Sequence, residues 1–174
     1  MNATLIRFKA FLFDYILIFA YLALLVVLNV FLFPSMQELF QGSLIKAQFV
    51  GFLMVTLPIS IYFILSDSVF GGQSFGKKKM GILVVDENGK ALSIPRAAFR
   101  TVLKFLPWEL SHFLVYRLVF IGDEAVPLSY SLIGTVIYAF MFVYILTSIF
   151  TKKKQSLYDI IAKTYVEKIK SVNK

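Results

Sequence analysis

The chain has 174 residues, of which 59% are hydrophobic and only 16% are charged, and its formal net charge is +8. Soluble domains carry about a quarter charged residues, so this composition excludes an ordinary soluble domain and indicates a membrane protein. The absence of cysteine excludes disulfides and thiolate metal sites, and we expect no cofactor. The length accommodates one membrane domain, residues 1–174, and no second globular unit.

Four apolar segments predict an all-α integral membrane protein with four membrane-embedded helices. They cover residues 10–33, 48–66, 107–121 and 128–150. The first segment would form a helix about 36 Å long, which is enough to cross a hydrocarbon core of about 30 Å. The third is too short to cross alone, so it crosses only as the end of a longer helix that begins near Pro95.

Lysine and arginine positions predict the orientation. Basic residues precede the first segment, fill the insert 67–106 and follow the last segment in the tail 151–174, whereas the connections 34–47 and 122–127 hold only Lys46. These clusters share one side of the membrane only when the number of crossings is even, and that side is normally the cytoplasm. We therefore expect four crossings of the cytoplasmic membrane, with both termini cytoplasmic.

The insert 67–106 has a β pattern in its middle. Residues 81–86 favour a strand, and Asn88-Gly89 is a hairpin turn signal, because a two-residue turn of this kind needs positive φ at both positions. Residues 91–94 would return as the second strand. Residues 164–169 are a candidate third strand that covers an edge.

Proline and basic residues shape the helices around this hairpin. From Pro95 onward, Arg96, Arg100 and Lys104 recur every fourth residue, which predicts a basic amphipathic helix at the cytoplasmic interface that Pro107 ends or kinks. In the second apolar segment, Pro58 frees a backbone carbonyl that a neighbouring helix or the nearby side chains of Thr56 and Ser60 must satisfy.

Three stretches of this chain resemble the RDD family of prokaryotic membrane proteins, which is named for an arginine and two aspartates. They are Arg7 with Asp14, residues 72–86 followed by Gly89, Arg96 and Arg100, and residues 154–166, which contain Asp159. The resemblance covers nearly the whole chain. It implies a suggested role in transport, because the family includes a member described as a sodium/proton antiporter, and it makes Arg7, Asp14 and Asp159 family-defining positions.

Asp14 is the leading candidate for an ion- or proton-binding carboxylate, because an ionisable residue inside an apolar segment is a functional hypothesis by default. The alternative is a structural ion pair or a helix-end charge. Arg7 and Arg100 are candidates for tuning carboxylate pKa values by their charge. The rise of about 10 Å between Arg7 and Asp14 argues against a direct pair, so each needs another partner. For Asp159, the pattern Ser156-x-x-Asp159 predicts a capping box, with ion binding as the alternative.

Glu109 and His112 are three residues apart and would share a helix face, as acid–histidine ligand pairs do in helix bundles. One pair is not by itself a metal site, which would need further carboxylates such as Asp14; proton or ion handling and simple packing are the alternatives. The run Lys77, Lys78 and Lys79 predicts contacts with anionic lipid headgroups. It follows Gly71-x4-Gly76, a near miss to a phosphate loop that lacks the required Ser or Thr.

The functional hypothesis is a small membrane protein that moves a cation, Na⁺ or H⁺, with no enzymatic activity and no nucleic-acid partner. Because four helices offer little wall for an aqueous path, we expect transport to require a homo-oligomer. The alternative is a non-transporting protein that binds anionic lipid or a protein partner through its basic cytoplasmic insert.

Overall fold

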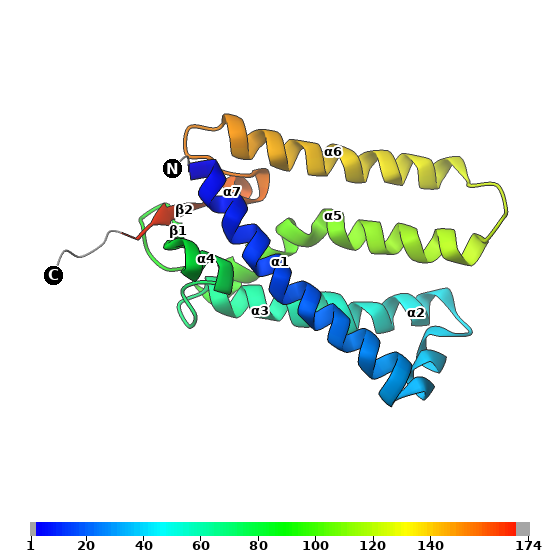
Figure 1. Cartoon of the computed structure of the whole chain (residues 1–174). Helices are drawn as coiled ribbons and strands as arrows, with labels where there is room; N and C mark the ends of the chain where they lie inside the picture. Colours follow the sequence, from blue (N-terminus) through cyan, green and yellow to red (C-terminus); the bar gives the residue numbers. More distant parts are fainter. Residues whose placement is uncertain (1–2, 170–174) are drawn as a thin grey trace.

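A computed structural model describes residues 3–169, and residues 170–174 of the predicted tail lie outside this part of the chain. Most of the described chain forms four long helical segments that run back and forth (Figure 1). They are α1 (Ala3–Val27) with the π turn η1 (Leu28–Leu32), α2 (Leu44–Gly51) continued by the π turn η3 (Phe52–Thr56) and α3 (Leu57–Asp67), α5 (Ile94–Ile121), and α6 (Leu128–Phe150).

The short elements gather at the end where α1 begins (Figure 1). They are α4 (Phe75–Met80), β1 (Ile82–Asp86), α7 (Leu157–Ile161) and β2 (Thr164–Lys168), whereas the 3₁₀ segment η2 (Pro34–Phe40) lies at the opposite end. We refer to these as the sheet end and the η2 end of the bundle. The helices between them carry many exposed large apolar side chains, as expected for surfaces that contact lipid.

Within residues 3–169, three helices are long and apolar enough to cross a membrane: Thr4–Leu32, Leu44–Asp67 and Leu128–Phe150. The predicted helical membrane fold is confirmed at this level. The fourth segment, 107–121, is part of the 28-residue helix α5, as expected for a helix that begins near Pro95. At about 1.5 Å per residue α5 is about 42 Å long, and it lies beside α6 for most of its length (Figure 1).

Prolines inside two helices are compensated by tyrosines from neighbouring helices. Pro58 cannot donate to the carbonyl of Met54, and the hydroxyl of Tyr21 on α1 donates to that carbonyl at 2.5 Å. Tyr21, rather than Thr56 or Ser60, is therefore the partner of the freed group.

The carbonyl that Pro107 frees in α5 is also satisfied by a tyrosine from a neighbouring helix. This carbonyl belongs to Leu103 and accepts a hydrogen bond of 2.6 Å from the hydroxyl of Tyr144 on α6. The helix continues through Pro107 to Ile121, so of the two predicted effects of Pro107, an end or a kink, the end is wrong. The reason is a partner from the last membrane helix, which the local sequence does not show.

The predicted hairpin is present only as a turn. Asp86 and Lys90 close it through a backbone hydrogen bond of 2.8 Å, and Gly89 has φ of +72°. Asn88 is not in the left-handed region, so the two-residue turn predicted for Asn88-Gly89 is wrong. Because Asp86 accepts hydrogen bonds from the amides of Asn88 and Lys90, its side chain stabilises a longer loop.

The returning strand predicted at 91–94 reduces to two isolated bridges, one between Val85 and Ala91 and one between Ser68 and Leu92. The ladder partner of β1 is instead β2, the predicted third strand, in an antiparallel pair that sets Val84 opposite Val166. Val84 packs with Leu92 and Ala97 in a small core that Val166 also contacts. The sheet thus joins the insert to the last segment of the described chain.

The basic face of the amphipathic helix predicted from Pro95 turns largely toward the protein interior. Arg100 and Thr101 are almost fully buried, and only Arg96 of the basic residues remains well exposed, where it pairs with Asp86 at 3.3 Å. Lys104 is half-buried with its ammonium 3.4 Å from the centre of the Phe63 ring. Acidic residues distant in sequence attract this basic face inward, and the location of the helix at the cytoplasmic interface stays a prediction.

Candidate functional site

Five charged residues form a continuous set of ion pairs at the sheet end of the bundle. We call it the buried charge network, and its members are Arg7, Asp67, Lys77, Arg100 and Asp159. They come from five elements, respectively α1, α3, α4, α5 and α7. The network therefore connects every helix at this end except α6.

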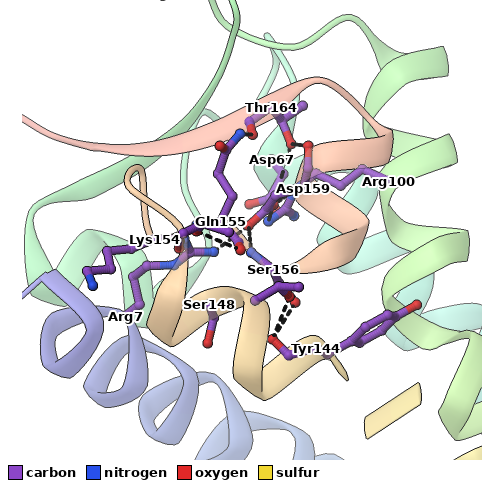
Figure 2. A network of polar contacts seen from close by, with 12 residues as sticks. Arg7, Asp67, Arg100, Tyr144, Ser148, Lys154, Gln155, Ser156, Asp159 and Thr164 are labelled. Atoms are coloured by element: carbon purple, nitrogen blue, oxygen red, sulfur yellow. Dashed lines mark hydrogen bonds and ion pairs between the residues drawn. The ribbon is translucent and has the colours of Figure 1, made fainter. Parts of the chain in front are cut away.

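Arg100 is at the centre of the network. Its Nη1 lies 2.9 Å from Oδ2 of Asp67 and its Nη2 lies 2.7 Å from Oδ1 of Asp159, while Nε donates to the same Oδ1 at 2.9 Å. Figure 2 shows the Asp67, Asp159 and Arg100 side chains converging between the ribbons. A guanidinium that bridges two carboxylates uses the planar donor geometry for which arginine is suited.

Asp159 caps a helix, as predicted, and it also takes part in ion pairs, while ion binding by it stays a prediction. Its carboxylate accepts a hydrogen bond of 3.3 Å from the amide of Ser156, which completes the predicted capping box at the start of α7. It also pairs with Arg7 and Arg100 (Figure 2). Burial by itself would raise the pKa of Asp159, but the charges of Arg100 and Arg7 outweigh burial and hold the pKa below its ordinary value.

Arg7 reaches across from α1 to the segment before α7. Its guanidinium contacts the carboxylate of Asp159 and the carbonyl of Lys154 (Figure 2). Two of the three family-defining residues are therefore direct partners, as expected from the distance that separates Arg7 from Asp14. Neither Arg7 nor Arg100 pairs with Asp14 in the described part of the chain. Their positive charges act instead on the carboxylates of Asp159 and Asp67.

Asp67 is a network residue that the sequence did not reveal, and Lys77 does not have the headgroup-facing position predicted for it. Asp67 is 1% exposed and pairs with both Lys77 and Arg100. Lys77 is buried too, so only Lys78 and Lys79 of the predicted headgroup-binding lysines are exposed. The available signal was an isolated acid directly after an apolar segment and ten residues before a lysine run.

Asp14 has a separate environment of hydrogen-bond donors. Its carboxylate accepts a bond of 2.7 Å from the hydroxyl of Ser74, another of 2.7 Å from the amide of Gly76, and a long one of 3.5 Å from the hydroxyl of Tyr62. Ser74 and Gly76 begin α4, so Asp14 holds this short helix against α1. These contacts favour the structural reading of Asp14, and ion binding by it stays a prediction.

The close approach of α4 to α1 requires a glycine at position 76, directly before the lysine run. A Cβ atom at this position would lie 1.9 Å from the carbonyl oxygen of Ala10 and 3.0 Å from Cγ of Asp14. Only a residue without a side chain lets α4 approach α1 closely enough for the amide of residue 76 to reach the carboxylate. The near miss to a phosphate loop is therefore a packing motif between two helices.

Glu109 and His112 meet a hydroxyl from another helix. Thr56 donates a hydrogen bond of 2.7 Å to Oε2 of Glu109, and its oxygen lies 3.5 Å from Nδ1 of His112. The Glu109 carboxylate and Nδ1 of His112 are 3.8 Å apart, and the ring of Trp108 packs edge-on against the imidazole. We call Thr56, Glu109 and His112 the acid–base cluster.

The acid–base cluster does not include Asp14, the further carboxylate that a metal site at Glu109 and His112 would need. Within residues 3–169 no group of three or more acidic or histidine residues is placed to hold a metal ion. The cluster therefore offers one carboxylate and one imidazole joined through a hydroxyl. Such a set can exchange and relay protons, and it offers few oxygen ligands for a fully dehydrated ion.

Apolar helices of membrane-crossing length, joined at one end by a buried charge network, define a helical membrane protein. The model of the RDD family matches residues 3–163. The chain therefore belongs to the RDD family, whose members are membrane proteins. No curated protein and no solved structure matches it.

Proposed function

We propose that this chain takes part in proton or cation transport across the cytoplasmic membrane, with Glu109 and His112 as the titrating groups. The observation that carries the proposal is the depth of the acid–base cluster. Thr56 lies twelve residues after Leu44 and eleven before Asp67, the ends of a membrane-length helix, which is about 18 Å and about 16 Å from them. Its partners Glu109 and His112 thus lie near the middle of the hydrocarbon layer.

Ionisable groups at this depth raise the free energy of insertion into the membrane, and helix packing alone does not require them there. On insertion scales an acidic or basic side chain at the centre of a membrane helix costs about 2.5–3.5 kcal/mol, and such residues commonly mark ion or proton pathways. Glu109 and His112 are each about one-third exposed in the isolated chain. They can therefore exchange protons with a water-filled path or with a group from another copy.

The Thr56 hydroxyl supports a relay between the two titrating groups. It has a single proton, which it donates to Glu109, so its oxygen faces Nδ1 of His112 as an acceptor. A proton on Nδ1 of His112 can then move to Glu109 through the hydroxyl, as Thr56 accepts on one side and donates on the other. Thr56 is buried, so bulk water does not compete with its hydroxyl for these hydrogen bonds.

We propose four crossings of the membrane, and the contacts of α5 support this number. α5 is long enough to cross, lies beside α6, and turns Arg100, Glu109 and Arg117 toward groups on α2 and α3 rather than toward lipid. An even number of crossings keeps both termini on the basic side, which we assign to the cytoplasm. Because four helices enclose little space for water, we propose that transport requires a homo-oligomer.

Proteoliposomes containing the purified protein test the proposal by proton and Na⁺ flux under imposed gradients. Glu109→Gln and Thr56→Val should abolish flux, because the first removes the titrating group and the second removes the hydroxyl at nearly constant volume. The matched control Thr56→Ser keeps the hydroxyl and should retain flux. Asp14→Asn should lower thermal stability but retain flux in the folded fraction.

The opposite pattern identifies the competing hypotheses. Loss of flux in well-folded Asp14→Asn, with normal flux in Glu109→Gln, would return the ion site to Asp14. Absence of flux in the unmodified protein under proton and Na⁺ gradients would refute the transport proposal. It would favour a non-transporting role in which exposed cations at the sheet end, such as Lys78 and Lys79, bind anionic lipid or a partner.

A further inference from the structure

A pocket of about 330 Å³ opens between α2 and α5 near the η2 end of the bundle. Its lining combines apolar side chains with two charged ones: Ile45, Gln48, Phe49, Phe52, Glu109 and Arg117. Glu109 is engaged by Thr56, as described above, so it belongs to the acid–base cluster. The remaining charged group of the pocket is the guanidinium of Arg117.

Arg117 uses only part of its donor capacity in its contacts within the described chain. Its Nη1 donates to Oε1 of Gln48 at 2.9 Å and to the carbonyl of Phe113 at 3.1 Å, and its guanidinium carbon lies 3.3 Å from the centre of the Phe113 ring. No carboxylate forms an ion pair with it in the part of the chain that the structure describes. These contacts fix the guanidinium and leave the N–H groups of Nε and Nη2 for a ligand.

The position of the pocket indicates what the ligand is. Gln48 lies four residues inside the start of its span at Leu44, and Arg117 lies four residues before the end of α5, each about 6 Å from a helix end. Ile45 and Phe49 beside them are 75% and 58% exposed on the apolar outer surface. The charge thus lies near the boundary of the hydrocarbon layer, in a pocket whose outer wall contacts acyl chains.

The wall that carries Gln48 is held in place by close packing. A Cβ atom on Gly51 would lie 2.0 Å from the hydroxyl oxygen of Tyr116, so the glycine lets the Tyr116 ring lie directly against α2. Tyr116 directly precedes Arg117, and Gly51 lies less than one helical turn after Gln48. The pocket is therefore a built feature of the α2–α5 interface rather than a loose gap.

We infer that this pocket binds the phosphate of a membrane phospholipid in the leaflet at the η2 end, with Arg117 as its ligand and Ile45 and Phe49 against the acyl chains. Arginine pairs with phosphate oxygens through two parallel N–H bonds, and the two unused nitrogens, Nε and Nη2, are adjacent on the guanidinium fork. The phosphate supplies the counter-ion that the described chain does not. The inference does not depend on transport by the acid–base cluster.

The experiment uses the full chain, purified in detergent and depleted of lipid. Phosphatidylglycerol is added back, and the bound lipid is counted by native mass spectrometry alongside the thermal unfolding midpoint. Diacylglycerol supplies the same chains without phosphate, and inorganic phosphate supplies the anion without chains. We expect only phosphatidylglycerol to be retained and to raise the unfolding midpoint.

Arg117→Gln should weaken phosphatidylglycerol binding about tenfold or more, since a hydrogen bond to a charged group contributes about 1.5–3 kcal/mol and 1.4 kcal/mol is a factor of ten. The matched control Lys46→Gln removes an exposed charge from the same end and should leave binding unchanged. Ile45→Trp, which fills the pocket from its exposed wall and keeps Arg117, should also weaken binding, so the test does not depend on the folding of one variant.

Equal lipid binding by Arg117→Gln and the unmodified protein would overturn the inference. So would equal weakening by Lys46→Gln, because that result would show a diffuse surface charge effect. Stabilisation by inorganic phosphate as strong as that by phosphatidylglycerol would show a soluble-anion site and would refute the lipid assignment.

Discussion

Replacing Arg100 by glutamine tests whether the buried charge network holds the sheet end of the bundle together. The guanidinium contacts Asp67 and Asp159, which are 1% and 0% exposed, and removal leaves each carboxylate with one remaining cation. Breaking a buried ion pair by removing one partner costs about 3–5 kcal/mol, because the other charge stays buried without full compensation. We expect a loss in this range for Arg100→Gln.

A matched control lies one helical turn away. Arg96 pairs with Asp86 on the surface, where its side chain is 41% exposed, and surface pairs contribute about 0–1 kcal/mol. In thermal unfolding of the purified protein, about 3–5 kcal/mol corresponds to a midpoint about 6–20 °C lower for a chain of this size. Arg96→Gln should lower the midpoint by no more than about 4 °C.

The pH dependence separates a lost ion pair from lost packing. In the unmodified protein the pKa of Asp159 is below its ordinary value, so its contribution is complete above the unfolded-state pKa and is lost as the pH falls through the folded-state pKa. Without Arg100, only Arg7 offsets the effect of burial, so the pKa of Asp159 is lowered less and protonation costs the folded protein less. The difference between the two proteins should therefore shrink as the pH falls below the ordinary aspartate pKa of about 3.9.

If Arg100→Gln lowers the unfolding midpoint no more than Arg96→Gln does, the claim that the network stabilises the fold is refuted. If Arg100→Gln lowers the midpoint by a large amount that stays constant with pH, the arginine acts through packing of its side chain. Refolding is not required for either reading if the scans of all variants use the same detergent and heating rate.

Three further predictions concern single contacts, each read as the thermal unfolding midpoint in detergent. Tyr144→Phe should lower the free energy of unfolding by about 1–3 kcal/mol, because the carbonyl freed by the proline in α5 loses its donor. The control Tyr138→Phe, on the exposed face of α6, should leave the midpoint unchanged. Equal midpoints for the two variants would refute the role of Tyr144. Gly76→Ala should lower the midpoint by the equivalent of about 1–3 kcal/mol or more, because its Cβ would meet a backbone oxygen of α1 at 1.9 Å; a neutral effect would contradict the close approach. Asp159→Asn should remove part of the stability loss on acidification below about pH 4, and an unchanged acid limb would assign that loss to other groups.

The sequence by itself determined the class of protein and much of its secondary structure. Long apolar segments can be satisfied in lipid only as helices, so their positions follow from composition without knowledge of their partners. The capping box at Asp159 is also local, because Ser156 and Asp159 lie within one turn and need nothing else to meet. The same holds for the separation of Arg7 from Asp14, which helix rise alone predicts.

Tertiary structure decided where the charges go. The basic side chains after Pro95 look like a surface pattern, yet Arg100 is buried because Asp67 and Asp159, 33 and 59 residues away, supply its counter-charges. α5 continues through Pro107 because Tyr144, which is 41 residues from Leu103, satisfies the freed carbonyl. Both outcomes depend on pairings between helices, which local periodicity cannot encode.

The acid–base cluster illustrates the same division. Glu109 and His112 are recognisable from their spacing in the sequence, but the hydroxyl that joins them comes from Thr56, 53 residues earlier in the chain. Only the packing of α5 against α2 and α3 sets this pair near the middle of a membrane-length helix and leaves Asp14 at the sheet end, held by the start of α4. Depth in the membrane gives an ionisable group its cost, and that depth is a property of the assembled bundle.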